Sequence, residues 1–253
     1  MPPPKPLLYD YPGSICCQMA RLALAEKGVV YEKRLVDIMG RAEQFAPWYT
    51  ALNPKAVVPT LKLGEEIVCD TFNIVARIDA DFDGPPLTPA DPAARQAMDV
   101  AMRDVMGLHY GVLLYCRRED GARHIAERGE FLRAERDKHP DRAEALDRRI
   151  AGNGRLQKLL ADPTAVEEHV GAARAVVDRL DAALAGKPFV AGEHYTLADA
   201  FASAALARFR LHGFQPWWSD GENANVAAYY ERMRSRPSWT AAGVIDSGSE
   251  ADL

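Results

Sequence analysis

The sequence lacks long apolar runs, an excess of positive charge and a dense set of cysteines. No segment of its 253 residues reaches the roughly 18 apolar residues that a membrane-spanning helix needs, so we expect no membrane association. Lysine and arginine number 31 against 36 aspartates and glutamates. This net charge of -5 argues against a nucleic-acid partner, because phosphate binding needs a basic surface. The first residues, MPPPKPLLYDY, contain no apolar stretch of the signal-peptide kind, which favours a cytoplasmic location.

The cysteines are too few and too scattered for a disulfide framework or a metal site. Cys16, Cys17, Cys69 and Cys116 form no C-x-x-C pair, and the six histidines do not join them at zinc-like spacing. We therefore predict no metal site. In a cytosolic chain these thiols are expected to be reduced, and a bridge between the neighbours Cys16 and Cys17 would be strained.

The first 82 residues alternate between strand and helix patterns. The apolar residues Ile15, Met19, Leu22 and Ala23 follow helical spacing, and a glycine at position 28 ends that helix. We expect strands at residues 6–11 and 29–38, a hairpin at 57–70, and helices at 14–27 and 71–82. This order is typical of a thioredoxin-like domain, which we assign to residues 1–82.

The remainder of the chain is predicted to be helical. Four prolines between residues 83 and 92 exclude a regular helix there and indicate a linker. We assign residues 93–253 to an all-helical domain, with a very polar helical insertion near 117–158 whose charged faces are expected to be solvated. Helix patterns cover residues 94–116, 165–186 and 195–213, and the last of these begins with the capping-box pattern Thr196-Leu197-Ala198-Asp199.

Three motifs identify a family resemblance. VVPTL at residues 57–61, CDTFNIVARI at 69–78 and KPFVAGEHYTLADA at 187–200 resemble segments of the glutathione transferase superfamily. The resemblance implies an α+β fold with a thioredoxin-like N-terminal domain and an all-helical C-terminal domain. It also implies glutathione as cosubstrate, a small hydrophobic or aromatic second substrate, and a homodimer.

The same motifs imply a set of glutathione-binding residues. A cis bond at Pro59 would expose the backbone of Val58 to the cysteinyl part of glutathione. Thr71 opens a helix whose N-terminus would hold the γ-glutamyl carboxylate, and Asp70 would take the ammonium group. Lys55, within LNPKAVVPTL, is assigned to the same site by the resemblance. For Thr71 the alternative is plain helix capping.

The first helix indicates the subclass. Ser14, Cys16 and Arg21 match the S-x-C-x-x-x-x-R pattern of zeta-type transferases, which include the maleylacetoacetate isomerases. The SIC sequence is similar to that of a bacterial offshoot, the tetrachlorohydroquinone reductive dehalogenases. Cys17 and Val57 depart from these patterns, and the departure at Val57 would weaken contacts to glutathione.

The resemblance implies that Ser14 and Cys16 are catalytic. A helix N-terminus is expected to lower the pKa of nearby thiols. Ser14 would donate a hydrogen bond to the glutathione sulfur, and Cys16 would attack the sulfur of an aromatic thioether to form a mixed disulfide. The motif favours Cys16 over Cys17, whereas helical geometry leaves the choice open, and either cysteine could simply fill a buried space.

The main functional prediction is reductive dehalogenation or thioether cleavage by a glutathione-dependent transferase. One alternative is cis–trans isomerisation of the maleylacetoacetate type, which needs no cysteine nucleophile. The other is a glutathione-binding protein without turnover.

Overall fold

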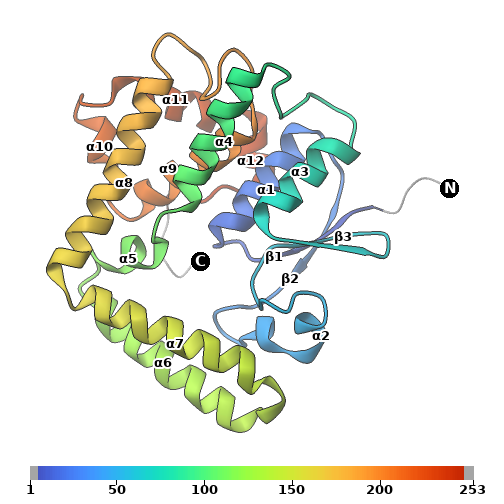
Figure 1. The fold of residues 1–253 in the computed structure, drawn as a ribbon, viewed down its shortest axis with the longest axis vertical. Coiled ribbons are helices and arrows are strands. Elements are labelled where there is room, and N and C mark those ends of the chain that lie inside the picture. The colour runs from blue at the N-terminus through green and yellow to red at the C-terminus, as the bar shows by residue number, and fades with distance from the viewer. Residues whose placement is uncertain (1–4, 248–253) are drawn as a thin grey trace. The chain divides into compact units, whose positions relative to one another are not determined.

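The computed structural model describes residues 5–247, and the elements follow the predicted order of strands and helices (Figure 1). The strands are β1 (Leu7–Asp10), β2 (Glu32–Leu35), β3 (Thr60–Leu63) and β4 (Glu66–Cys69). The helices that precede the prolines are α1 (Ile15–Glu26), η1 (Glu43–Phe45), α2 (Pro47–Thr50) and α3 (Thr71–Asp81). The helices that follow are α4 (Pro92–Met106), α5 (Tyr110–Tyr115), α6 (Gly121–Lys138), η2 (Pro140–Arg142), α7 (Ala143–Leu160), α8 (Pro163–Ala183), α9 (Leu197–Leu211), α10 (Pro216–Ser219), α11 (Ala224–Arg234) and α12 (Pro237–Ala242).

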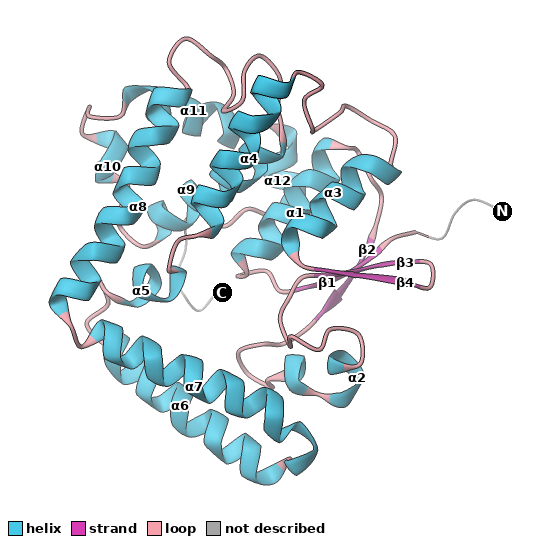
Figure 2. Ribbon diagram, in the orientation of Figure 1, coloured by secondary structure: helices cyan, strands magenta, loops and turns pink. Residues whose placement is uncertain are grey.

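The four strands form one mixed sheet in the order β2-β1-β3-β4. β1 pairs parallel with β2 and antiparallel with β3, and β3 and β4 form the predicted hairpin. Helices α1 and α3 pack against each other beside the sheet (Figure 2). The predicted thioredoxin-like arrangement is therefore confirmed, although the second strand is shorter than the 29–38 that the sequence indicates.

Helix α1 begins and ends where the sequence predicts. Ser14 caps its N-terminus by accepting a hydrogen bond from the backbone N–H of Cys17 at 3.3 Å. At the other end Gly28 adopts a φ of 68°, a left-handed conformation that costs glycine nothing and stops the helix.

The prediction of one long helix over residues 94–116 is wrong. Helix α4 ends at Met106, and a second, short helix, α5, begins only at Tyr110. His109 sits between them in a non-helical conformation and uses its Nδ1 atom to accept from the N–H of Val112. The side chain at the break thus supplies a cap to α5 that the periodicity of the sequence does not reveal.

The chain forms two compact units that are interleaved along the sequence. The first unit contains residues 1–36, 58–107 and 174–253, and the second contains residues 37–57 and 108–173. In the second unit, α6 and α7 lie side by side as a helical hairpin (Figure 1). A small apolar core joins this hairpin to the segment before Val58, and its buried members are Ala42, Phe45, Ala56, Leu132 and Leu146.

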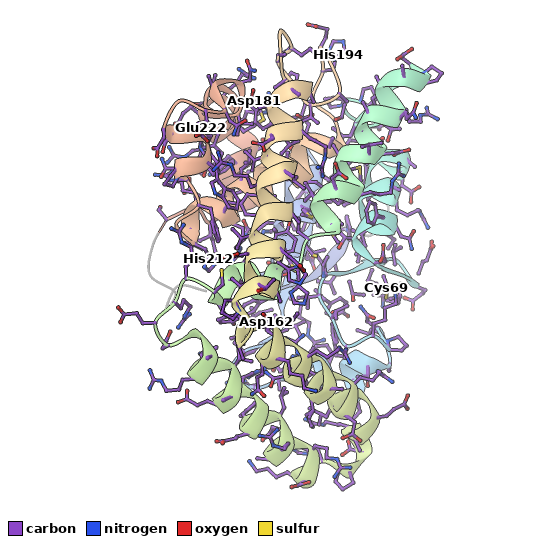
Figure 3. The ribbon with its side chains drawn as sticks, turned by 60° about the vertical axis from the view of Figure 1, so that its left-hand side comes forward. Cys69, Asp162, Asp181, His194, His212 and Glu222 are labelled. Atoms are coloured by element: carbon purple, nitrogen blue, oxygen red, sulfur yellow. The ribbon has the colours of Figure 1, made fainter. Side chains whose placement is uncertain are left out.

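Helix α9 lies in the core of the first unit and is buried over almost its whole length. Its N-terminus carries the predicted capping box, in which the Asp199 carboxylate accepts from the N–H of Thr196 at 2.8 Å. Helix α8 is tied to the α10–α11 segment by Asp181 and Glu222, which Figure 3 labels. Among residues 5–247, no helix has both the length and the apolar character that crossing a membrane would require.

Candidate functional site

Sheet register brings three predicted site segments to the same edge of the sheet. Thr60 pairs with Tyr9 on one side and with Cys69 on the other. Continuing these antiparallel registers by one residue places Pro59 beside Asp70 on one side and Asp10 on the other, and a second residue places Val58 beside Tyr11. The N-terminus of α1, the Val58–Pro59 bond and the N-terminus of α3 therefore converge within the first unit.

The Val58–Pro59 peptide bond is cis, as the resemblance implies. Val58 and Pro59 are both buried, and they precede the first residue of β3. Lys55 is exposed and belongs to the second unit, so its assignment to the glutathione site stays a prediction.

Asp70 and Thr71 form the N-terminus of α3. Asp70 is the N-cap, and its carboxylate accepts from the N–H of Phe72 at 3.0 Å. It has a φ of 76°, which is a strained conformation for a residue with a side chain and is often retained at functional sites. Asp70 is exposed whereas Thr71 is buried, so the carboxylate faces solvent at a helix end that attracts anions.

The two adjacent cysteines have different environments. Cys17 is completely buried, and its Sγ accepts a hydrogen bond from the N–H of Tyr11 at 3.4 Å. Burial and the nearby Asp10 charge raise the pKa of Cys17 far above its ordinary value. Cys16 is partly exposed at the site. Of the two thiols, only Cys16 combines access to solvent with a place among the converging segments.

The expectation that the helix N-terminus lowers the pKa of Cys16 is wrong. Burial raises the pKa of this thiol, a hydrogen bond from Thr71 opposes that shift, and the charge of Asp70 adds to it. Desolvation thus outweighs the hydrogen bond from Thr71, and Cys16 keeps its proton at neutral pH. The hydrogen bond also joins the two helix N-termini directly, since Cys16 belongs to α1 and Thr71 to α3.

Alkylation should report this difference between the two thiols. Because the pKa of Cys16 is raised, we expect slow labelling by iodoacetamide at pH 7 and faster labelling as the pH rises through the thiol pKa. Thr71→Val removes the hydrogen bond that favours the thiolate, so labelling at a given pH should slow further. Peptide mass spectrometry of the folded protein would measure this, with Cys17 unlabelled throughout. Maximal labelling of Cys16 already at pH 7 would contradict the burial argument.

Sequence reasoning gave no role to the polar side chains that hold the turn before α1. Arg21 is buried and forms an ion pair with Asp10 at 2.5 Å. It also donates to the carbonyl oxygens of Pro12 at 3.1 Å and Ala242 at 2.6 Å. The sequence signal for this role of Arg21 is the fixed position of the arginine in the S-x-C-x-x-x-x-R pattern.

Two other features of the described residues lie outside this site. A groove of about 470 Å³ runs between α4 and α8 in the first unit, and none of the predicted site residues lines it. Within residues 5–247, no cluster of three or more histidine, cysteine, aspartate or glutamate side chains is arranged to hold a metal ion.

Comparison with known proteins gives two family matches. The model of the glutathione S-transferase N-terminal domain matches residues 8–86, and that of the C-terminal domain matches residues 163–232. A tetrachloro-p-hydroquinone reductive dehalogenase from Sphingobium chlorophenolicum is 34% identical over 252 residues, covering 96% of this chain and 97% of the relative. This chain belongs to the glutathione S-transferase family. Membership makes glutathione the cosubstrate and confirms the predicted fold class.

Other relatives of this glutathione S-transferase extend the comparison. A probable maleylacetoacetate isomerase from Caenorhabditis elegans is 34% identical over 91 residues, which cover 36% of this chain and 42% of the relative. The crystal structure of the β-etherase LigF from Sphingobium sp. strain SYK-6 superimposes with a TM-score of 0.76. It is 22% identical and covers 94% of this transferase and 98% of its own chain, so it supports the fold.

Proposed function

We propose that this transferase removes a substituent from a small aromatic compound through glutathione and Cys16, by reductive dehalogenation or thioether cleavage. The observation that carries the proposal is the partly exposed Cys16 thiol, hydrogen-bonded to Thr71 where two helix N-termini meet. The full-length similarity to a reductive dehalogenase supports the same reaction class.

The proposed reaction balances over three steps. Glutathione thiolate first displaces halide from the ring and forms a carbon–sulfur bond. Cys16 then attacks the thioether sulfur, so that a sulfur–sulfur bond forms, the carbon–sulfur bond breaks, and the ring carbon takes up a proton. A second glutathione reduces the mixed disulfide, which restores Cys16 and releases oxidised glutathione. The second step balances because the proton that Cys16 loses when it attacks is the one that the ring carbon takes up.

The other site residues have proposed roles in binding glutathione. The Asp70 carboxylate is exposed and suits the ammonium group, while the N-terminus of α3 at Thr71 suits the γ-glutamyl carboxylate. Backbone groups of Val58, ahead of the cis Pro59, suit the cysteinyl part. Lys55 completes the proposed set. We also propose a cytoplasmic homodimer, which the four free thiols and the family support.

Ser14 is proposed to stabilise the glutathione thiolate. Its Oγ accepts from the N–H of Cys17, and its hydroxyl hydrogen, which reaches the Cys17 thiol, would donate to the glutathione sulfur when glutathione binds. Ser14→Ala should therefore raise the pKa of bound glutathione by about one unit and slow conjugation at neutral pH about tenfold. The ultraviolet absorbance of the bound thiolate across a pH series would measure this. An unchanged titration would remove Ser14 from the mechanism.

Mass spectrometry would test the whole proposal. The wild-type enzyme is incubated with glutathione and either a halogenated hydroquinone or an aryl thioether, then quenched with acid. We expect dehalogenated or thiol-free product, oxidised glutathione, and a Cys16–glutathione mixed disulfide. Glutathione binding without any product from either substrate would contradict the proposal.

A second candidate function is glutathione-dependent cis–trans isomerisation. The local similarity to a probable maleylacetoacetate isomerase, together with Ser14 at the cap of α1, favours it. In that reaction glutathione adds to a conjugated double bond and leaves after rotation, so Cys16 is dispensable. If the Cys16→Ser variant still isomerises a cis-dienone diacid, this candidate would be supported.

A further inference from the structure

The three residues that precede Ser14 each have their carbonyl group hydrogen-bonded. The Tyr11 carbonyl accepts from the N–H of Ser14 at 3.0 Å. The Pro12 carbonyl accepts from Gln18 at 3.4 Å and from Arg21 at 3.1 Å. The Gly13 carbonyl accepts from the guanidinium of Arg208. This turn, residues 11–14, is therefore held from several sides within the first unit.

Arg208 reaches the turn from a distant part of the chain. It lies on α9, is only 3% exposed, and is separated from Gly13 by 195 positions. Burying a guanidinium removes it from water, so a buried arginine needs strong acceptors. One acceptor of its guanidinium is the carbonyl of Gly13, the residue immediately before Ser14.

The geometry points to Arg208 as a positioning residue that fixes the Ser14 hydroxyl through the Gly13 carbonyl. The inference rests on the proposed role of Ser14. A cation on the Gly13 carbonyl polarises the Gly13–Ser14 peptide group. This polarisation strengthens the hydrogen bond that the Ser14 N–H donates to the carbonyl oxygen of Tyr11. The serine is thereby held at the start of α1. There its Oγ caps the helix, and its hydroxyl hydrogen can donate to the sulfur of bound glutathione.

The residues of α1 that hold this turn also have partners elsewhere in the first unit. Arg21 also binds Asp10 and the Ala242 carbonyl, so its removal would disturb β1 and the C-terminal segment as well. Gln18 has a second bond too, since its Oε1 accepts from the N–H of Ile245 at 3.2 Å. A change in either residue would mix several effects.

The test is a pH titration of bound glutathione in Arg208→Met. Methionine keeps an unbranched apolar side chain but donates no hydrogen bond. We expect the thiol pKa of bound glutathione to rise by about one unit, so that conjugation at neutral pH falls about tenfold and recovers at higher pH. KM for glutathione should change less than about twofold, because the binding residues are untouched. Arg208→Lys, which keeps a charged donor, should restore part of the loss.

Arg210→Met is the matched control. Arg210 lies two residues further along α9 and forms an ion pair with Asp246 at 2.8 Å. It should leave the titration unchanged. Equal shifts in the two variants would show a general effect of loosening α9 and would overturn the inference. So would an Arg208→Met titration that matches the wild type.

A double variant separates this inference from the proposed function. If Arg208 acts through Ser14, the double variant Ser14→Ala with Arg208→Met should give bound glutathione the same thiol pKa as Ser14→Ala alone. If the two residues act independently, their pKa shifts should add. Additive shifts would overturn the inference and leave Ser14 in place. A wild-type enzyme that binds no glutathione would instead overturn the proposed function. If Arg208→Met does not fold, Arg208→Gln, whose shorter side chain falls short of the Gly13 carbonyl, carries the same expectations.

Discussion

Cys16→Ser should let the first half of the reaction proceed and block the second. Glutathione conjugation depends on Ser14 and the helix ends, which the substitution leaves in place. A serine hydroxyl is a far weaker nucleophile toward sulfur and forms no mixed disulfide. We therefore expect the aromatic thioether to accumulate in a one-to-one ratio with released halide, and release of the final product to fall by about three orders of magnitude.

Cys17→Ala provides the control for this substitution. Cys17 is fully buried and its raised pKa keeps it protonated, so we expect near-normal product formation with only a modest loss of stability. Chromatography of thioether and product, with mass spectrometry of the cysteine-containing peptide, measures both variants. Full turnover by Cys16→Ser together with loss of turnover by Cys17→Ala would reverse the assignment of the nucleophile.

Asp199→Ala should lower the free energy of unfolding by about 5 kcal/mol. The carboxylate is completely buried and accepts from the N–H of Val190 at 2.9 Å, the N–H of Thr196 at 2.8 Å and the hydroxyl of Tyr229 at 3.0 Å. Alanine would leave these donors buried without acceptors, and each unsatisfied donor costs about 1–3 kcal/mol. The capping box of α9 would be lost at the same time.

An exposed cap on another helix shows how much of this loss comes from burial. Asp91 caps α4 by accepting from the N–H of Ala94 at 2.8 Å in an exposed position, so Asp91→Ala should cost about 1 kcal/mol. Urea unfolding followed by circular dichroism would compare the two. If Asp199→Ala does not fold, Asp199→Asn, which keeps one acceptor oxygen, should still lose more than Asp91→Ala. Equal losses would contradict the burial argument.

Local patterns were enough to predict much of the architecture from the sequence. The hairpin of β3 and β4 and the capping box at Thr196 each depend on residues that are close together in the chain. The cis bond at Pro59 was instead implied by the family resemblance of the segment VVPTL. The break between α4 and α5 was missed because His109, a residue with no strong breaking tendency, caps the second helix with its side chain.

The electrostatic state of the site could not be predicted in the same way. A helix N-terminus is visible in a sequence, but the burial that raises the pKa of Cys16 comes from residues on α3 and from the packing of α1. The contact between Arg208 and Gly13 joins residues 195 positions apart. Such contacts depend on the tertiary fold, and no local pattern in the sequence of α9 distinguishes Arg208 from Arg210, which binds Asp246 instead.

The interleaved second unit has a consequence for dividing this protein into modules. Its apolar core combines Phe45 and Ala56, which come from the N-terminal part of the chain, with Leu132 and Leu146 from the α6–α7 hairpin. Cutting the chain at the proline-rich linker would therefore expose half of that core on each fragment. The polar insertion thus shares an apolar core with the chain segment that leads to Val58. A chimera or redesign that changes one of these two segments must therefore keep the other matched to it.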